Sequence, residues 1–241
     1  MYGDVYVKRR NVIYMKTLLI IPAYNEGENI ERVVDRIKKD FPCYDYVVVN
    51  DGSKDNTEKI CRERGFNYVS HPINIGLAGA FQTGMKYAYA HGYDSAIQFD
   101  GDGQHNPEFI ASMQEAMEEG YNIIIGSRFV NEKKPHSLRM LGSNLIQAAI
   151  KITTGKTIRD TTSGMRLFDK GMIEKLALSY DMGPEPDTVA LLLRKGAKVK
   201  EVQVEMSERI AGKSYLTLTK SINYMARMLV SILILQWFRR G

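Results

Sequence analysis

Two aspartates, Asp100 and Asp102, stand one residue apart directly after residues 95–99, a run that is typical of a buried β-strand. The end of a strand fixes the positions of side chains, and α/β proteins usually bind phosphates at the carboxyl edge of a parallel sheet. Carboxylate oxygens are also the ligands that hard divalent cations prefer. The pair therefore predicts a site for a metal-bound diphosphate.

The residues after this pair help to decide between a ligand site and a plain turn, because Asp and Gly are also common in turns. Asn106 can cap a helix, and Pro107 suits the first helical position. The pair would then lie between a strand and a helix, and this placement favours the ligand site.

Polar residues also follow the first two expected strands. The first strand ends at Pro22, with Tyr24 and Glu26 close behind, and the second is followed by Asp51 and Ser53. The carboxyl ends of parallel strands share one edge of the sheet, so these side chains should meet the aspartate pair. A nucleotide base could stack on them or form hydrogen bonds with them.

A loop of small residues that contains Asn74 and Gly76 precedes another expected helix. Such a loop lets the backbone approach a ribose or a phosphate closely. It has neither the Walker lysine pattern nor the G-x-G-x-x-G spacing of dinucleotide-binding proteins. The loop therefore argues against a nucleotide hydrolase and against a dehydrogenase.

The elements that must position these residues alternate between helix and strand. Four helical stretches each end at a glycine that is followed by an extended run: Gly65, Gly92, Gly120 and Gly196. Apolar strands of this kind are typical of parallel sheets covered on both faces. We expect strands over residues 18–21, 46–49, 66–69, 95–99, 123–125 and 199–206, and helices over residues 30–40, 57–64, 78–91, 107–119, 143–153 and 186–195. The predicted fold class is α/β with a mainly parallel central sheet.

The length and composition of the chain indicate how many domains it contains. The 241 residues are 44% hydrophobic and 25% charged, which is ordinary for a soluble protein with one sizeable core. We predict one domain over residues 16–215, an N-terminal extension at residues 1–15 and a C-terminal helix over residues 216–241.

Cys43 and Cys61 suggest neither a disulfide framework nor a zinc site. The N-terminal residues show no signal peptide, and the sequence favours a reducing cytoplasm.

The C-terminal residues differ in character from the rest. Residues 228–238 form an apolar run that contains Trp237 and is flanked by arginines. Such a run, if helical, would rise roughly 16 Å, about half of the ~30 Å hydrocarbon core of a bilayer, so it cannot span a membrane. Two interpretations stay open: an amphipathic helix on an anionic membrane surface, or a helix packed on the domain or on a second subunit. The net charge of +5 suits an anionic partner but does not select one.

Several motifs occur together in an order that is similar to family-2 inverting glycosyltransferases. They are Ile21-Pro22-Ala23-Tyr24-Asn25-Glu26, Val49-Asn50-Asp51-Gly52-Ser53-Lys54-Asp55, Asn74 with Gly76, Asp100-Gly101-Asp102-Gly103-Gln104-His105, Gly126-Ser127-Arg128, and residues 160–168. The chain most resembles the dolichol-phosphate and polyprenyl-phosphate mannosyltransferase group, over residues 16–216. The resemblance implies a GT-A fold, a Rossmann-like nucleotide-binding domain.

The resemblance also implies a divalent cation and a nucleotide sugar. Asp102 is the expected direct ligand of Mg²⁺ or Mn²⁺, and Asp100 and Gln104 would hold the metal or the donor sugar. The ion would neutralise the charge that builds on the departing diphosphate. The donor is expected at Pro22, Tyr24, Glu26, Asp51, Ser53, Asn74, Gly76 and Asp100, with Arg209 and Lys213 on a loop that closes over it.

The acceptor implied by the resemblance is a lipid phosphate. Arg128, Arg139 and Ser143 match the family's acceptor-phosphate pattern, since arginine forks suit phosphate oxygens. Asp187 or Glu185 stands where the family usually keeps an acidic residue near the acceptor. An ionised phosphate needs no general base, so the acid would contact sugar, and a base role belongs only to a hydroxyl acceptor.

The sequence thus predicts an inverting glycosyltransferase with Asp100, Asp102, Arg128 and Asp187 as catalytic residues. It would move a hexose or N-acetylhexosamine from a UDP- or GDP-linked donor to a polyprenyl phosphate, bound peripherally to the inner face of the cell membrane and without a nucleic-acid partner. Two alternatives stay open: transfer to a glycan or protein hydroxyl, and a non-catalytic nucleotide- or membrane-binding protein. Self-association through the apolar C-terminal run is also left open.

Overall fold

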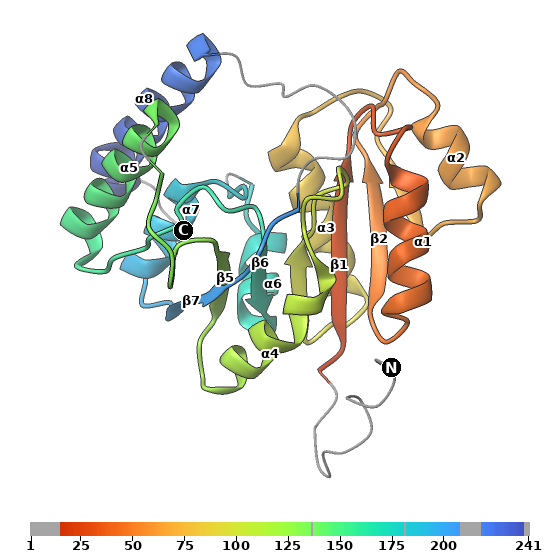
Figure 1. Cartoon of the computed structure of the whole chain (residues 1–241), viewed down its shortest axis with the longest axis horizontal. Coiled ribbons are helices and arrows are strands. Elements are labelled where there is room, and N and C mark those ends of the chain that lie inside the picture. Colours follow the sequence, from red (N-terminus) through yellow and green to blue (C-terminus); the bar gives the residue numbers. More distant parts are fainter. Residues whose placement is uncertain (1–14, 136, 181, 208–217, 239–241) are drawn as a thin grey trace.

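A computed structural model of the chain describes residues 15–135, 137–180, 182–207 and 218–238. Its centre is a seven-stranded sheet with the strand order β3-β2-β1-β4-β6-β5-β7 (Figure 1). The strands are β1 (Thr17–Ala23), β2 (Asp45–Asn50), β3 (Tyr68–Ser70), β4 (Ser95–Gln98), β5 (Ile123–Ser127), β6 (Arg166–Asp169) and β7 (Val199–Gln203). The helices are α1 (Ile30–Asp40), α2 (Thr57–Glu63), α3 (Leu77–Ala90), α4 (Ile110–Glu118), α5 (Leu138–Thr154), α6 (Lys170–Ala177), α7 (Pro186–Arg194) and α8 (Leu218–Leu233), with 3₁₀ turns η1 (Pro107–Phe109) and η2 (Leu235–Trp237).

All strands except β6 run in one direction, which confirms the mainly parallel sheet. β1 pairs in parallel with β2 and β4, β2 with β3, and β5 with β7. β6 lies antiparallel between β4 and β5. The residues that lead into β6 therefore reach the edge at which the other strands end. This places residues 160–164 beside the aspartate pair.

Helices cover both faces of the sheet, as near-continuous apolar strands require. On one face, Phe81 and Met85 of α3 pack in a single core with residues of α5, α6, α7 and α8. On the other face, Ile37 of α1 and Met113 of α4 pack against Leu19, Ile21 and Ile97 of the sheet, together with residues of α2. The central strands carry almost fully buried apolar side chains on both faces, and this rigid layer fixes the loops at its edge.

The expected helices agree with the structure to within one residue, apart from residues 107–119, whose first three residues form the 3₁₀ turn η1 ahead of α4, and residues 143–153. That helix, α5, begins at Leu138, because Ser137 caps it by accepting a hydrogen bond from the Met140 N–H at 3.2 Å. Gly142 lies inside α5 where α8 crosses it, and a Cβ there would stand 1.6 Å from the Met225 sulfur. The four glycines expected to end helices all adopt positive φ.

Strand β6 and helix α6 were not expected from the sequence. β6 has four residues, begins with the buried Arg166 and shows no apolar periodicity. Helix α6 contains Gly171, which lowers helix propensity, and is capped by Asp169, whose carboxylate accepts from the Met172 N–H at 2.7 Å. Both elements are stabilised by burial between β4, β5 and α3 rather than by local sequence.

The C-terminal segment is helical from Leu218 to Leu233 and not over the whole apolar run at 228–238. Helix α8 packs against α5 and α7, side by side with α5 in Figure 1. Arg194 at the end of α7 stacks its guanidinium 3.6 Å from the centroid of the Trp237 ring. The interpretation as a helix packed on the domain is thereby confirmed for the described residues. No helix within those residues has the length and apolar character of a membrane span.

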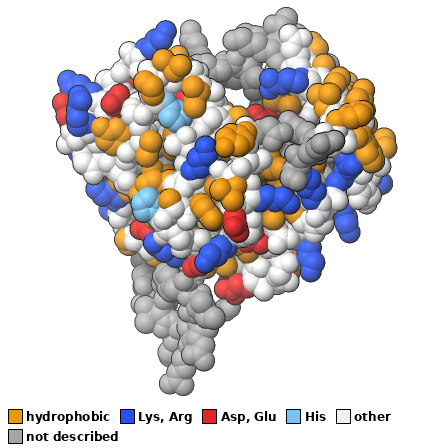
Figure 2. Space-filling view, turned by 180° about the vertical axis from the view of Figure 1, so that it is seen from behind, with side chains coloured by type: hydrophobic (Ala, Val, Ile, Leu, Met, Phe, Trp, Pro, Cys, Tyr) orange, Lys and Arg blue, Asp and Glu red, His pale blue; other side chains and the backbone are white. Residues whose placement is uncertain are grey.

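An exposed apolar surface remains on α5, α8 and η2. We call it the α5–α8 apolar surface; it comprises Leu141, Leu145, Ile152, Ile222, Val230, Leu233, Ile234, Leu235, Trp237 and Phe238. Hydrophobic side chains gather at the upper right of Figure 2, on the side where α5 and α8 lie, with Lys and Arg around them. Trp237 is 58% exposed and Phe238 is 78% exposed. Although α8 packs on the domain, this surface therefore remains available for a second contact.

Candidate active site

A pocket of about 310 Å³ opens at the carboxyl edge of the sheet, between the ends of β1, β2 and β4 and the start of α3. It brings together residues that are far apart in the chain because parallel strands end at one edge. Its lining comprises Pro22, Ala23, Tyr24, Glu26, Asp51, Asn74, Gly76, Leu77, Ala80, Asp100, Gly101 and Asp102. All of the expected donor-binding residues in the described part of the chain line this pocket, except Ser53.

His105 fixes the position of Asp100. The Asp100 backbone N–H donates to His105 Nδ1 at 2.9 Å, so the ring proton is on Nε2, which lies 3.4 Å from Asp100 Oδ2. The imidazole is buried and stacks edge-on against Phe99. Gly164, just before β6, leaves space here, because a Cβ on it would stand 3.2 Å from Asp100 Oδ2. The Asp100 side chain stays 36% exposed toward the pocket.

Asp102 is more deeply placed than Asp100, with 5% exposure. Its Oδ1 accepts from the Gln104 N–H at 3.0 Å, and this bond closes the turn that separates the two aspartates from α4. The expected cap follows, since Asn106 Oδ1 accepts from the Glu108 N–H and Pro107 opens η1. The turn therefore presents both carboxyl groups to the same pocket.

Asp51 holds two loops together beneath the pocket. Its carboxylate accepts from the N–H groups of Ile75 and Gly76 at 3.0 and 2.8 Å, and from His71 Nδ1 at 2.9 Å. Gly52 has φ +62°, and a Cβ there would stand 2.4 Å from the Ile73 carbonyl carbon. Asp51 thus shapes the floor of the pocket with three hydrogen bonds already in place.

Ser53 has a supporting position outside the pocket lining. Its Oγ accepts from the Asn25 N–H at 3.0 Å, and the Asn25 side chain accepts from the Lys54 N–H at 2.8 Å. Asn25 adopts φ +56°, an uncommon conformation that Asn tolerates. Ser53 therefore stabilises the turn that carries Tyr24 and Glu26 into the pocket.

Arg128 is held by a buried carboxylate. Its Nε donates to Asp160 Oδ2 at 2.7 Å and its Nη2 to Asp160 Oδ1 at 2.8 Å. Burial raises the pKa of Asp160, but the hydrogen bonds and charge of Arg128 outweigh burial and leave the pKa below its ordinary value. Asp160 thus occupies the Nε–Nη2 edge, one of the two edges with which a guanidinium can bind an anion bidentately.

Ser143 of α5 is fully buried. It lies next to Lys134, a residue that sequence reasoning did not select. Lys134 Nζ donates to Ser143 Oγ at 3.3 Å, to Asn144 Oδ1 at 2.9 Å and to Gln147 Oε1 at 2.9 Å. Burial lowers the pKa of Lys134. Arg139 belongs to α5 one turn before Ser143, but its side chain lies outside the described residues, as do Arg209 and Lys213.

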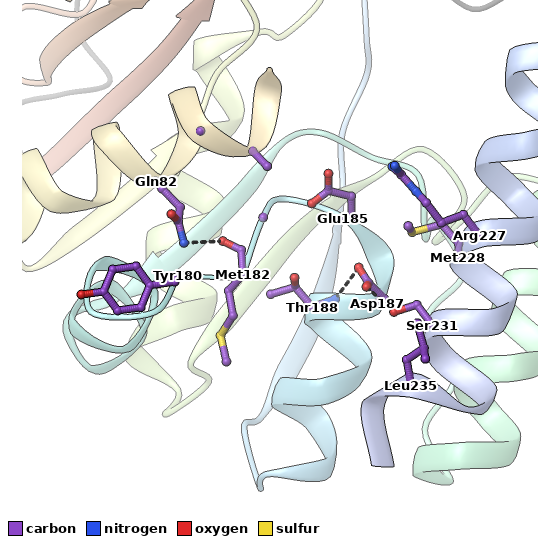
Figure 3. A pocket seen from close by; sticks show the side chains of 13 residues that line it. Gln82, Tyr180, Met182, Glu185, Asp187, Thr188, Arg227, Met228, Ser231 and Leu235 are labelled. Atoms are coloured by element: carbon purple, nitrogen blue, oxygen red, sulfur yellow. Dashed lines mark hydrogen bonds between the residues drawn. The ribbon is translucent and has the colours of Figure 1, made fainter. Parts of the chain in front are cut away.

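A second pocket, of about 420 Å³, lies between α3, α7 and α8 and contains both acids of the Glu185-Pro186-Asp187 sequence (Figure 3). Arg227 and Ser231 of α8 face the two acids in this view. Asp187 Oδ2 accepts from the Ser231 hydroxyl at 2.6 Å, and Oδ1 accepts from the Thr188 N–H at 2.9 Å. Burial and the nearby Asp187 charge raise the pKa of Glu185.

Arg166 is a further residue that sequence reasoning missed. It is fully buried in β6, where its guanidinium donates to the Thr161 carbonyl at 2.9 Å and to the Pro184 carbonyl. One cation thereby joins the loop before β6 to the loop that carries Glu185. A lone arginine in a short strand gave no signal of this role in the sequence.

The fold and this edge of the sheet define a GT-A-like α/β glycosyltransferase. Residues 18–177 match the model of Glycosyl transferase family 2, and the chain belongs to that family. The predicted family and enzyme class are therefore confirmed.

Relatives within the family act on different sugars. The chain is 30% identical over 212 residues to polyprenol monophosphomannose synthase of Mycolicibacterium smegmatis, covering 83% of this chain and 80% of that protein. It is 34% identical over 181 residues to UDP-N-acetylglucosamine–dolichyl-phosphate N-acetylglucosaminyltransferase of Methanococcus voltae, covering 66% and 71%.

Solved structures share the fold. Glucosyl-3-phosphoglycerate synthase of Mycobacterium tuberculosis, in complex with Mn²⁺, UDP-glucose and phosphoglyceric acid, matches 94% of this chain and 81% of that protein. The TM-score is 0.67 and the sequence identity is 18%. At this identity the likeness establishes the GT-A-like fold and carries no information on substrates.

Proposed function

We propose that this protein transfers one sugar from a nucleotide-diphosphate sugar to a polyprenyl phosphate at a membrane surface. The proposal depends chiefly on one observation: Asp100 and Asp102 line the same pocket as Tyr24, Asp51 and Gly76. Tyr24 and Asp51 suit the base of a nucleotide sugar, and the loop at Gly76 lets the backbone approach its ribose or phosphates. The two aspartates suit its diphosphate with a bound metal ion. The relatives named for transfer to polyprenyl and dolichyl phosphates support the acceptor class.

A divalent cation fits the chemistry of the donor set. Asp100, Asp102 and Gln104 offer carboxylate and amide oxygens, which suit Mg²⁺ and Mn²⁺. The described residues contain no group of three or more His, Cys, Asp or Glu that could hold an ion alone. A site of one or two carboxylates completed by substrate phosphates is the usual way in which proteins bind Mg²⁺. When bound, the ion would stabilise the charge of the leaving diphosphate.

The chain's own residues would orient the donor. His105 and the Gln104 N–H hold the two aspartates in fixed positions, and Asp51 fixes the loop that carries Gly76. Preorganised groups of this kind act without reorganisation during the reaction. Leu77 and Ala80 provide the apolar wall of the pocket and limit the water around the donor.

The geometry favours an acceptor that is already ionised. Asp187 already accepts a hydrogen bond on each oxygen, from Ser231 and from the Thr188 N–H, which supports a positioning role for this carboxylate rather than that of a base. A phosphate monoester needs no base at neutral pH, because its oxygen is an anion. We therefore favour lipid phosphate over a glycan or protein hydroxyl, with Glu185 facing the sugar.

The α5–α8 apolar surface suits contact with a membrane. The surface has exposed aromatic residues, and α5 and α8 also carry the exposed basic residues Lys151 and Arg227, a combination typical of interfacial helices on anionic lipid. We propose peripheral attachment by this surface on the cytoplasmic side. Self-association through the same surface stays a prediction that a measurement of mass in solution would decide.

Incubation of the purified protein with undecaprenyl phosphate, Mn²⁺ and a panel of UDP- and GDP-sugars tests the proposal. Mass spectrometry of the lipid fraction should find one added sugar with one donor, and none after Asp102→Asn. Chelation with EDTA should abolish the product. Transfer to water or to a free glycan, with unmodified lipid for every donor, would refute the lipid-phosphate acceptor.

A further inference from the structure

The two acids at the start of α7 lie against different helices. Asp187 is buried, and its Oδ2 accepts a hydrogen bond of 2.6 Å from the Ser231 hydroxyl of α8 (Figure 3). Glu185 lines the same pocket but lies toward α3, because a Cβ on Gly183 would overlap Glu185 Oε2 and stand 2.9 Å from the Ala78 Cβ. Asp187 is thus tied to α8, whereas the Glu185 carboxyl is a neighbour of the first turn of α3.

The pocket that contains these acids borders the donor pocket. Ala78 and Gly79 line the pocket of the acids, and Gly76 and Leu77, which directly precede them, line the donor pocket. Successive Cα atoms are only about 3.8 Å apart. The two pockets therefore meet at the first turn of α3. A sugar attached to a diphosphate in the donor pocket would have the acids next to it.

The packing of α8 determines where Ser231 points. Met228 and Ile232 are buried in the core that α8 shares with α3, α5 and α7, whereas Val230 and Leu233 are exposed. This packing fixes the rotation of α8 about its axis and turns the Ser231 hydroxyl toward α7. Ser231 is itself buried, and a hydrogen bond to a charged group is stronger where water is excluded. The bond therefore fixes the orientation of the carboxylate that accepts it.

We propose that Ser231 is a positioning residue for sugar transfer, which holds Asp187 in the orientation in which the two acids receive the transferred sugar. This inference rests on the proposed function, because that sugar is the one carried by the nucleotide donor. Helices α7 and α8 follow the residues 18–177 that match the family model, so the family match assigns no role to Ser231. Without the hydroxyl, the Asp187 carboxylate can turn, and a misplacement of about 1 Å can lower a rate by about a hundredfold.

Substitutions at Ser231 separate the hydroxyl from the space that the side chain fills. Ser231→Ala should lower kcat/KM for the nucleotide sugar about tenfold and leave the KM for the lipid phosphate unchanged. Ser231→Thr keeps a hydroxyl and should recover most of the rate, whereas Ser231→Val has the same branched shape without the hydroxyl and should not. Ser221→Ala makes the same change at a position of α8 outside the pocket lining and should transfer as the wild type does.

A double-mutant cycle tests whether Ser231 acts through Asp187. If it does, adding Ser231→Ala to Asp187→Ala should cause no further loss of kcat/KM. Independent losses that add would overturn the proposal, as would equal rates for the Thr and Val variants. If Ser231 only fastens α8 to α7, Ser231→Ala should lower the melting temperature and leave kcat/KM unchanged, and this result would also overturn it.

A binding measurement without acceptor separates this inference from the proposed function. The probe is whichever of UDP-glucose, UDP-N-acetylglucosamine and GDP-mannose binds the wild type most tightly with Mn²⁺ in a calorimeter. Ser231→Ala should bind this probe about tenfold more weakly and its free nucleotide diphosphate equally well. Equal affinities for the probe would overturn the role of Ser231. The expected difference, with no transfer by the wild type to any lipid phosphate, would overturn the proposed acceptor and support the role of Ser231.

Discussion

Arg128 and Asp160 form a two-point ion pair, with Nε 2.7 Å from Oδ2 and Nη2 2.8 Å from Oδ1. Asp160 is fully buried, and Arg128 is about three-quarters buried, with 26% of its side chain exposed. The pair joins the end of β5 to the loop before β6, and that loop passes beside Asp100. It thereby links the region of the expected acceptor to the donor pocket.

Arg128→Ala should lower the stability of the folded protein, apart from any effect on catalysis. Removing one partner of a buried pair leaves the other charge uncompensated, at a cost of about 3 kcal/mol in the free energy of unfolding. Urea denaturation at neutral pH measures this change. Arg62→Ala, which removes an exposed arginine from α2, is the control and should unfold as the wild type does. Identical midpoints for the two variants would contradict the structural role of Arg128.

The same pair predicts a loss of stability in acid. The folded pKa of Asp160 lies below its ordinary value of 3.8, so the unfolded chain binds the proton first as the pH falls. The stabilisation is therefore complete above about pH 4 and disappears as the pH falls through the folded pKa. Melting temperatures measured from about pH 5 down to about pH 2 should fall less steeply for Asp160→Asn, relative to its own neutral value. Parallel curves would show that Asp160 contributes no such dependence.

Glu185 should show the opposite sign. Its folded pKa lies above the ordinary 4.5, so its charge costs stability at neutral pH. Glu185→Gln should resist urea better than the wild type at pH 7, and the difference should vanish below about pH 4.5, where both side chains are neutral. Sugar transfer should fall in the same variant, because Glu185 faces the pocket. A variant that is less stable at neutral pH would count against a raised pKa.

The α5–α8 apolar surface should govern membrane attachment. Phe238→Ala removes a 78% exposed aromatic side chain and should weaken binding to anionic lipid vesicles about tenfold, without changing the melting temperature. Sedimentation with phosphatidylserine vesicles measures the bound fraction. Leu178→Ala, an exposed apolar change outside the α5–α8 apolar surface, is the control. An equal effect of both variants would contradict attachment by this surface.

Much of the fold could be predicted because local signals agree with the tertiary structure. Glycine in a left-handed conformation marks the ends of four helices, and apolar runs mark strands that are buried on both faces. β6 could not be predicted, because its buried Arg166 is compensated by backbone carbonyls of the preceding loop and of the loop before α7. The early start of α5 was also hidden, since Gly142 is accommodated by Met225 of a helix much later in the chain.

The donor pocket was easier to predict than the acceptor region. Residues such as Tyr24, Asp51 and Asp100 follow strands directly, and a parallel sheet brings strand ends together. The partners of Arg128 and Ser143 instead depend on how residues 129–135 and α5 pack on the loop before β6. Spacing alone gave no means to see that Asp160 binds Arg128, or that Lys134 points to Ser143.

The central claim is that Asp102 and Asp100 bind the nucleotide donor through a divalent cation. Calorimetric titration with UDP and GDP, each with and without Mn²⁺, tests it most directly, with Glu118→Gln as a charge-matched control at an exposed position. We predict metal-dependent binding of one nucleotide to the wild type and to the control, and at least about tenfold weaker binding to Asp102→Asn. Equal, metal-independent affinities for all three proteins would contradict the account.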